Sequence, residues 1–348
     1  MGKTQRNIAI DLVKAIAIIF VVAIHTCAEG FYFPLDSSQF IATTIIRSFV
    51  SPAVPLFLIA SGALMLKPEK ELPVSRLWKK NILRLVVAML FWATAYKMLY
   101  LAATDNFSTS SILNAIKEVL IFDQEFHLYY IHITLLVYAF LPVTRTFVKN
   151  ADDSILKYFL VVWYVLAVIY PTAYMYWPIK LIQGFPIQWM INMTYAAIGY
   201  GVAGFYFSKK PTSLKTSLIL SVLGFAGVFT LTYFYSLKTN TLYDVYLGGM
   251  SLPVSITAFG AFNLCKHIAS LIQKSKVASD FIVFLSKASF CIYLVHIFVL
   301  RAFVYFGLDA TTFHPGLSIH LITVSNICIS LLIYLVLSKI PFVNKWLI

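Results

Sequence analysis

Apolar stretches long enough to cross a lipid bilayer recur along the whole chain and leave only short connections between them. A transmembrane helix needs about 20 predominantly apolar residues, and in lipid its backbone groups must bond to one another. Ten stretches meet this requirement, allowing for weak ends, near residues 8–28, 43–66, 81–102, 128–147, 155–172, 188–207, 214–236, 247–268, 281–304 and 317–338. The sequence therefore predicts an all-α polytopic membrane protein of about ten transmembrane helices, with residues 1–348 forming a single domain embedded in the lipid bilayer.

The charge distribution predicts the orientation of this protein. Hydrophobic residues make up 60% of the chain and charged residues 12%, and the mean hydropathy of +0.83 excludes a water-soluble domain of this size. With a cytoplasmic N-terminus, most lysines and arginines fall into loops on one side, as the positive-inside rule requires. This assignment predicts both termini cytoplasmic. It also explains the net charge of +13, so a nucleic-acid partner is not needed.

The first span carries ionisable groups at both ends, in the stretch DLVKAIAIIFVVAIHTCAE over residues 11–29. Lys14 and His25 are eleven residues apart, which places them on one face of a helix about 16 Å apart along its axis. Glu29 lies one further turn along. Lys14 reaching the headgroups and His25 bonding a neighbouring helix is the plain interpretation. Ionisable groups inside a span are costly, however, and indicate a functional site.

Basic residues also crowd the start of the third span, in RLWKKNILR. Arg76 and Lys79 are typical of topological anchors. Lys80 and Arg84 are at i,i+4 and share a helix face. Together with Lys14 they form a candidate phosphate-binding corner, because arginine and lysine at partly dehydrated depth suit a diphosphate.

The loops on the opposite side are rich in aromatic and acidic residues, in FYFPLD, FDQEFH, YPTAYMYWP and TLYDVY. Tyrosine and tryptophan at this depth commonly anchor a span at the interface. As a group they also suit a carbohydrate site, since aromatic faces stack on sugar rings and carboxylates accept hydroxyl hydrogen bonds. The candidate substrate-binding residues are Asp36, Asp123, Glu125 and His127. We interpret His132 and His296, deeper in their spans, as interhelical hydrogen-bonding residues.

This constellation suits a reaction carried across a membrane. Lys14, Lys80 and Arg84 would hold a phosphate-bearing donor from the cytoplasm, while His25 acts as general base on an acceptor hydroxyl. Glu29 or Asp36 would orient the imidazole, and acyl transfer from a thioester fits this arrangement. The sequence contains no GxSxG, HExxH or P-loop motif. Its four cysteines lack disulfide or metal-site spacing, so no metal ligands are assigned.

The chain resembles the acyltransferase-3 family of integral membrane acyltransferases. Four blocks carry the resemblance in the family's order, namely IDLVKAIAIIFVVAIH at 10–25, VPLFLIASGALML at 54–66, FHLYYIHITLLVYAFLPV at 126–143 and LSKASFCIYLVH at 285–296. The resemblance implies acetyl-CoA or another acyl-CoA as donor substrate, no permanently bound cofactor, and a sugar hydroxyl of a cell-surface glycan as acceptor. It implies His25, as base or acyl relay, and Lys14 as the family's motif pair. It places the protein in the bacterial cytoplasmic (inner) membrane, as an O-acetyltransferase similar to that of enterobacterial common antigen.

Two departures from the family pattern concern the donor site. Many members have arginine where this chain has Lys14, and an Arg-x-x-Arg pair at the third span is reduced here to Arg84, with Asn81 in the earlier place. Lys80 is the candidate substitute. A competing interpretation is a transporter of a glycan or lipid-linked glycan. The sequence shows neither the internal hydropathy repeat nor the matching broken helices expected of a transporter. It does not decide between a monomer and a homo-oligomer.

Overall fold

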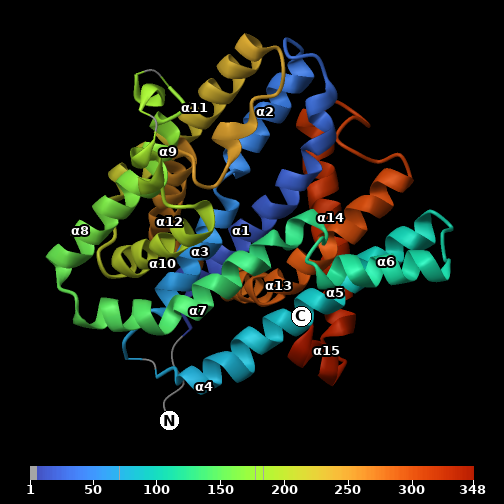
Figure 1. Cartoon of the computed structure of the whole chain (residues 1–348), viewed down its shortest axis with the longest axis horizontal. Helices are drawn as coiled ribbons and strands as arrows, with labels where there is room; N and C mark the ends of the chain where they lie inside the picture. Colours follow the sequence, from blue (N-terminus) through green and yellow to red (C-terminus); the bar gives the residue numbers. More distant parts are fainter. Residues whose placement is uncertain (1–5, 70, 177, 183) are drawn as a thin grey trace.

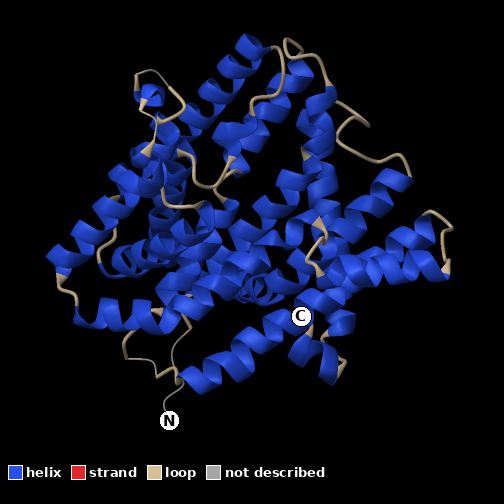
Figure 2. Ribbon diagram, viewed as in Figure 1, coloured by secondary structure: helices blue, strands red, loops and turns tan. Residues whose placement is uncertain are grey.

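The computed structural model describes residues 6–69, 71–176, 178–182 and 184–348, and the elements in these ranges are helices joined by loops (Figure 2). The first part comprises α1 (Ile8–Thr26), η1 (Ala28–Tyr32), α2 (Ser38–Val50), α3 (Ala53–Met65), α4 (Val74–Arg76), the π-helix η2 (Leu77–Ile82), α5 (Leu83–Ala103), α6 (Thr109–Leu120), η3 (Phe126–Leu128) and α7 (Tyr129–Asn150). The remainder comprises α8 (Asp153–Tyr164), the π-helix η4 (Val165–Ile169), α9 (Tyr170–Ala173), η5 (Ile179–Leu181), η6 (Phe185–Trp189), α10 (Met193–Lys209), α11 (Leu214–Thr239), η7 (Asp244–Leu247), α12 (Leu252–Ile272), α13 (Lys276–Tyr305), α14 (Pro315–Leu337) and α15 (Pro341–Trp346). The all-α class is confirmed.

Within the described residues, nine helical stretches are long and apolar enough to cross a bilayer. They are α1, α2 with α3, α4 through α5, η3 with α7, α8 through α9, α11, η7 with α12, α13, and α14. The tenth expected span, 188–207, corresponds to α10, which has 17 residues. It begins later than expected because the Asn192 side chain accepts a hydrogen bond from the Thr194 backbone N–H at 2.9 Å and so caps the helix at its start.

Five of the nine candidate spans in the described residues are not single continuous α-helices, the second and third among them. The second breaks between Val50 and Ala53, at the Ser51-Pro52 pair, because proline lacks the N–H that would continue the helical ladder. The third begins with α4 and then passes through the π-helix η2 before α5. Such π-helical turns are rare and frequently mark functional sites.

Helix α1 lies in the interior of the bundle, where it packs against α3, α12, α13 and α14 (Figure 1). A second close pair is formed by α3 and α10. A Cβ atom added at Gly62 would lie 2.0 Å from the backbone oxygen of Gly201, so only glycine allows this approach. The small Ser61-Gly62 pair in α3 therefore allows α10 to pack closely against it. These packed helices hold α1, and with it Lys14 and His25, in a fixed position.

Candidate active site

A cavity of about 1030 Å³ joins the two ends of α1 inside the bundle. Its walls come from α1, α2, α3, the start of the third span, η3 with α7, the loop after η7, α13 and α15. Lys14 and His25 both line it, as their spacing of eleven residues on one helix predicts. We call the two parts of this cavity the Lys14 end and the His25 end.

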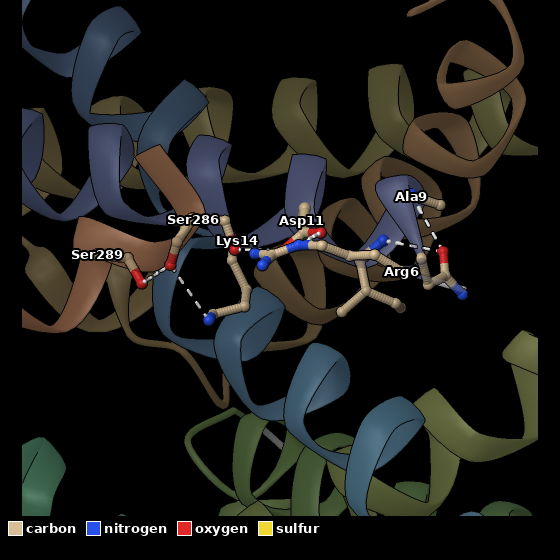
Figure 3. Close-up of polar contacts among 8 residues, drawn as sticks. Arg6, Ala9, Asp11, Lys14, Ser286 and Ser289 are labelled. Carbon is tan, nitrogen blue, oxygen red and sulfur yellow. Dashed lines mark hydrogen bonds and ion pairs between the residues drawn. The ribbon is translucent and has the colours of Figure 1, made fainter. Parts of the chain in front are cut away.

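The Lys14 side chain has no carboxylate partner among the described residues, although Asp11 lies one turn before it. Arg6 takes that carboxylate, donating to its two oxygens at 2.7 and 2.8 Å. The Ser286 hydroxyl donates to Asp11 at 2.6 Å, while Lys14 Nζ donates to the Ser286 backbone oxygen at 3.3 Å (Figure 3). This network ties the start of α1 to α13, and Lys14 lines the cavity without a direct ion pair to a carboxylate of the described residues.

Six more cationic side chains line the cavity together with Lys14. They are Arg76, Lys79, Lys80, Arg84, Lys287 and Lys345, contributed by α4, η2, α5, α13 and α15. The described residues that line the cavity include no aspartate or glutamate. The Lys14 end is therefore a site of concentrated positive charge, which favours a ligand carrying several negative charges.

Arg84 contacts the last turns of the chain. Its guanidinium donates to the backbone oxygen of Ile348, its Nε is buried without a hydrogen-bond partner, and its Cζ lies 5.9 Å from the ring centre of Phe290. Trp92 holds the same segment by donating to the Leu347 backbone oxygen at 2.9 Å. Sequence reasoning singled out neither Lys345 nor Lys287, although Lys287 lies within the block 285–296. Helix α15 places Lys345 in the cavity wall.

The His25 end is built from three imidazole rings. The rings of His25 and His296 have centroids 5.2 Å apart, and those of His127 and His296 are 5.3 Å apart. His127 is buried, and neither of its ring nitrogens has a hydrogen-bond partner. The Tyr293 hydroxyl holds the turn that carries His127 by donating to its backbone oxygen at 2.7 Å. His25 belongs to the first expected span and His296 to the ninth, while His127 lies in the η3 turn just before the fourth.

His296 does not form the interhelical hydrogen bond that we expected of its side chain. Its Nδ1 bonds the backbone oxygen of Tyr293, on its own helix, at 2.8 Å, which fixes the proton on Nδ1. Its Nε2 is buried without a partner. His132, interpreted in the same way, packs against Phe122 with ring centroids 5.4 Å apart, outside the cavity.

The four carboxylates predicted for the site do not line the cavity. Asp36 and Asp123 are exposed, and Glu125 accepts hydrogen bonds from Arg301 at 2.8 Å. Glu29 contributes to η1, whose tighter 3₁₀ turns rotate it away from the cavity-lining face of α1. Its Oε2 is buried without a partner, and burial raises the pKa of this carboxyl. We expected Glu29 or Asp36 to orient His25, but no hydrogen bond joins either carboxylate to His25 in the described part of the structure.

Aromatic residues from distant loops meet near the His25 end. Tyr176, Tyr235, Tyr243 and Tyr246 form a cluster, with centroid separations between 5.2 and 6.4 Å. Tyr246 is buried beside Leu247, which lines the cavity. Two of the four aromatic loop segments therefore come together, although these rings pack mainly on one another.

Arg47 and Ser51 are cavity-lining residues that sequence reasoning missed. Arg47 belongs to α2, and Ser51 follows it at the break before α3. The available signal was an arginine inside the apolar second span. Among the described residues, no group of three or more His, Cys, Asp or Glu side chains is placed to hold a metal ion.

Comparison with protein families gives a match over nearly the whole chain. The model of the acyltransferase-3 family, described as an acyltransferase domain, matches residues 7–335. The matched region includes the residues of the His25 end and, apart from Lys345, the cationic residues of the Lys14 end. Comparisons with curated proteins and with solved structures gave no match.

Proposed function

Because this chain belongs to the acyltransferase-3 family, we propose that it transfers an acyl group, most simply acetyl, from cytoplasmic acyl-CoA to a polysaccharide hydroxyl. The acceptor is a cell-surface or lipid-linked polysaccharide, and the protein works in the bacterial inner membrane. The membrane class and the acyltransferase family come from the helices and the family match. The donor, the acceptor and the residue roles are the content of the proposal.

The observation that carries the proposal is the single cavity that links a cation cluster to a histidine cluster. Coenzyme A carries a diphosphate and a further phosphate on its nucleotide and a thioester at the far end of a long, flexible arm. A cavity with seven cationic residues at one end and His25 at the other matches this distribution of charge and reactivity. The proposal assigns donor binding to Lys14, Lys80 and Arg84, supported by the neighbouring cations.

His25 then performs the chemistry in one of two ways. As general base it takes the proton of the acceptor hydroxyl, whose oxygen attacks the thioester carbonyl. The tetrahedral intermediate collapses, the carbon–sulfur bond breaks, and the imidazolium returns its proton to the leaving thiolate. As acyl relay its nitrogen attacks the thioester carbonyl first, the carbon–sulfur bond breaks, and the leaving thiolate takes up the proton of the acylated imidazolium. The acceptor hydroxyl then attacks the acyl group, the carbon–nitrogen bond breaks, and the hydroxyl proton passes to the released imidazole nitrogen.

The test is transfer of label by purified protein in lipid vesicles, using radiolabelled acetyl-CoA and a cell-surface glycan extract. Wild type is compared with His25→Ala and Arg84→Ala, and with His132→Ala as a histidine control outside the cavity. We expect label in the glycan with wild type and His132→Ala, none with His25→Ala, and a higher acetyl-CoA requirement with Arg84→Ala. A wild-type protein that transfers no label but accumulates glycan inside vesicles would be a transporter and would overturn the proposal.

A further inference from the structure

Arg47 is a charged residue inside a membrane span that neither donor binding nor base catalysis uses. It lies on α2, within the second candidate span Ser38–Met65, and lines the cavity within electrostatic range of His25. A charged group at this depth is costly and is typically retained because it contacts a partner or a pathway.

The described part of the protein supplies Arg47 with no ion-pair partner. The ion pairs of the described residues involve Arg6, Lys97, Lys210 and Arg301. Asp244, a carboxylate in its neighbourhood, is exposed at the start of η7 and makes no ion pair with it. A guanidinium has five N–H donors, and the contact shown for Arg47 is a single hydrogen bond from Nη1 to the Ser51 hydroxyl at 2.8 Å.

This hydrogen bond fixes the guanidinium in the cavity wall. The Ser51 hydroxyl in turn donates to the Arg47 backbone oxygen at 2.7 Å, so the pair forms a closed local ring at the break between α2 and α3. Pro52 follows directly and stiffens the break. The charged group is thus held in place while its remaining donors face the cavity.

The anion that Arg47 meets is not the donor's phosphate group in the proposed arrangement. The phosphates lie among the seven cations at the Lys14 end, whereas Arg47 lines the cavity together with His25 and Tyr129. The remaining substrate in this part of the cavity is the acceptor. A planar guanidinium binds carboxylates and phosphates with two parallel hydrogen bonds, which fixes orientation as well as charge.

We infer that Arg47, positioned by Ser51, is an acceptor-binding residue that selects acceptors carrying a carboxylate or phosphate close to the hydroxyl that is acylated. The inference rests on the proposed acyl transfer and specifies its substrate class. An anionic sugar enters with its charge on Arg47 and presents a neighbouring hydroxyl to His25. A neutral sugar of the same shape lacks this attachment and leaves the arginine unpaired.

The experiment compares methyl glucuronide with methyl glucoside, two acceptors that share a ring and differ in charge. The proteins are detergent-solubilised wild type, Arg47→Gln, Arg47→Lys, and Lys117→Gln as a charge-removing control on the exposed face of α6. One readout is kcat/KM for release of the coenzyme A thiol from acetyl-CoA. The other is the shift in melting temperature that each sugar causes without acetyl-CoA.

We expect wild type to prefer the glucuronide by about tenfold, the size of one charge-assisted hydrogen bond. Arg47→Gln loses this preference by losing glucuronide activity alone, Arg47→Lys keeps part of it, and Lys117→Gln keeps all of it. The inference is overturned if wild type shows the same kcat/KM and the same shift in melting temperature with both sugars. The inference is also overturned if Arg47→Gln lowers kcat/KM equally for both sugars, because such a loss would place the arginine at the reacting carbonyl.

The binding readout separates this inference from the proposed function. If no acetyl-CoA is consumed with any acceptor, the acyltransferase proposal fails, yet a glucuronide-specific rise in melting temperature that Arg47→Gln abolishes still supports the anion site. If thiol release occurs without any charge preference in rate or melting temperature, the inference fails and the proposed function stands. Should Arg47→Gln not fold, Arg47→Lys decides, because a folded lysine variant with the full wild-type preference contradicts a bidentate contact.

Discussion

The Lys14 end and the His25 end of the cavity differ in the number of cationic side chains that line them. The Lys14 end gathers seven cations from six elements, and Arg76, Lys79 and Lys80 among them are exposed. The His25 end holds three imidazoles, and of the described residues that line the cavity there one, Arg47, is a cation. The first arrangement suits capture of a multiply charged ligand from water, and the second suits proton transfer in a site with little water. In the proposed function, donor binding and chemistry are therefore separated along α1.

The largest expected effect of a single change is at His25. His25→Gln keeps a polar side chain but removes the base, and we expect kcat to fall by about 10²–10⁴-fold. Binding of acetyl-CoA should stay unchanged, because the cations are at the other end. Single-turnover kinetics and equilibrium binding of acetyl-CoA measure the two separately. A parallel loss of acetyl-CoA affinity would show that the two ends are not independent.

The reverse pattern is expected at Arg84. Arg84→Gln removes a donor contact, and we expect the KM for acetyl-CoA to rise by about tenfold with little change in kcat. Lys215→Gln, which removes an exposed cation at the start of α11 outside the cavity, serves as the matched control. A fall in kcat at saturating acetyl-CoA would instead place Arg84 in the chemical step.

His296 tests whether the imidazole cluster acts through His25. His296→Leu removes a ring that packs on His25 and whose Nε2 is buried without a partner. We expect kcat to fall by about tenfold through misplacement of His25, with the KM for acetyl-CoA unchanged. The melting temperature should change little, since no interhelical hydrogen bond of the side chain is lost. An equally active, less stable variant would reduce His296 to a packing residue.

The buried carboxyl of Glu29 leads us to expect that wild type and Glu29→Gln differ in stability by an amount that depends on pH. Burial raises the pKa of its carboxyl in the folded protein, so the folded state holds the proton more tightly than the unfolded chain does. As the pH rises from the ordinary carboxyl pKa through the raised folded value, the folded protein loses stability relative to the unfolded chain. Glu29→Gln removes this loss and should raise the melting temperature at neutral pH, but not below about pH 4, where both states are protonated. A melting temperature difference that does not vary with pH contradicts the assignment.

The smallest effect is expected at Asp36. Its side chain is exposed and outside the cavity wall, so Asp36→Asn should leave kcat and the KM values for acetyl-CoA and acceptor unchanged. The measurement is a steady-state comparison with wild type. A raised KM for the acceptor alone would restore Asp36 as the substrate-binding residue that the sequence predicted and extend the site beyond the His25 end.

Features within one helix could be predicted from the sequence. The helical class follows from the apolar stretches, because a lipid-embedded backbone must satisfy its own hydrogen bonds. The shared cavity of Lys14 and His25 follows from helical periodicity alone. The same reasoning failed for Glu29, since α1 ends at Thr26 and the next turns are 3₁₀. It also counted α10, with 17 residues, as a full span.

Features that depend on which helices are neighbours were decided by the tertiary structure. Packing of α1 against α13 brings His296 to His25, the turn at η3 adds His127, and α15 carries Lys345 to the Lys14 end. The α2 register turns Arg47 toward the cavity. By itself the sequence determined an all-helical membrane protein with a base and a cation on one helix face, because hydropathy and periodicity are local properties. Contacts between segments hundreds of residues apart arise only when side chains from different helices pack together.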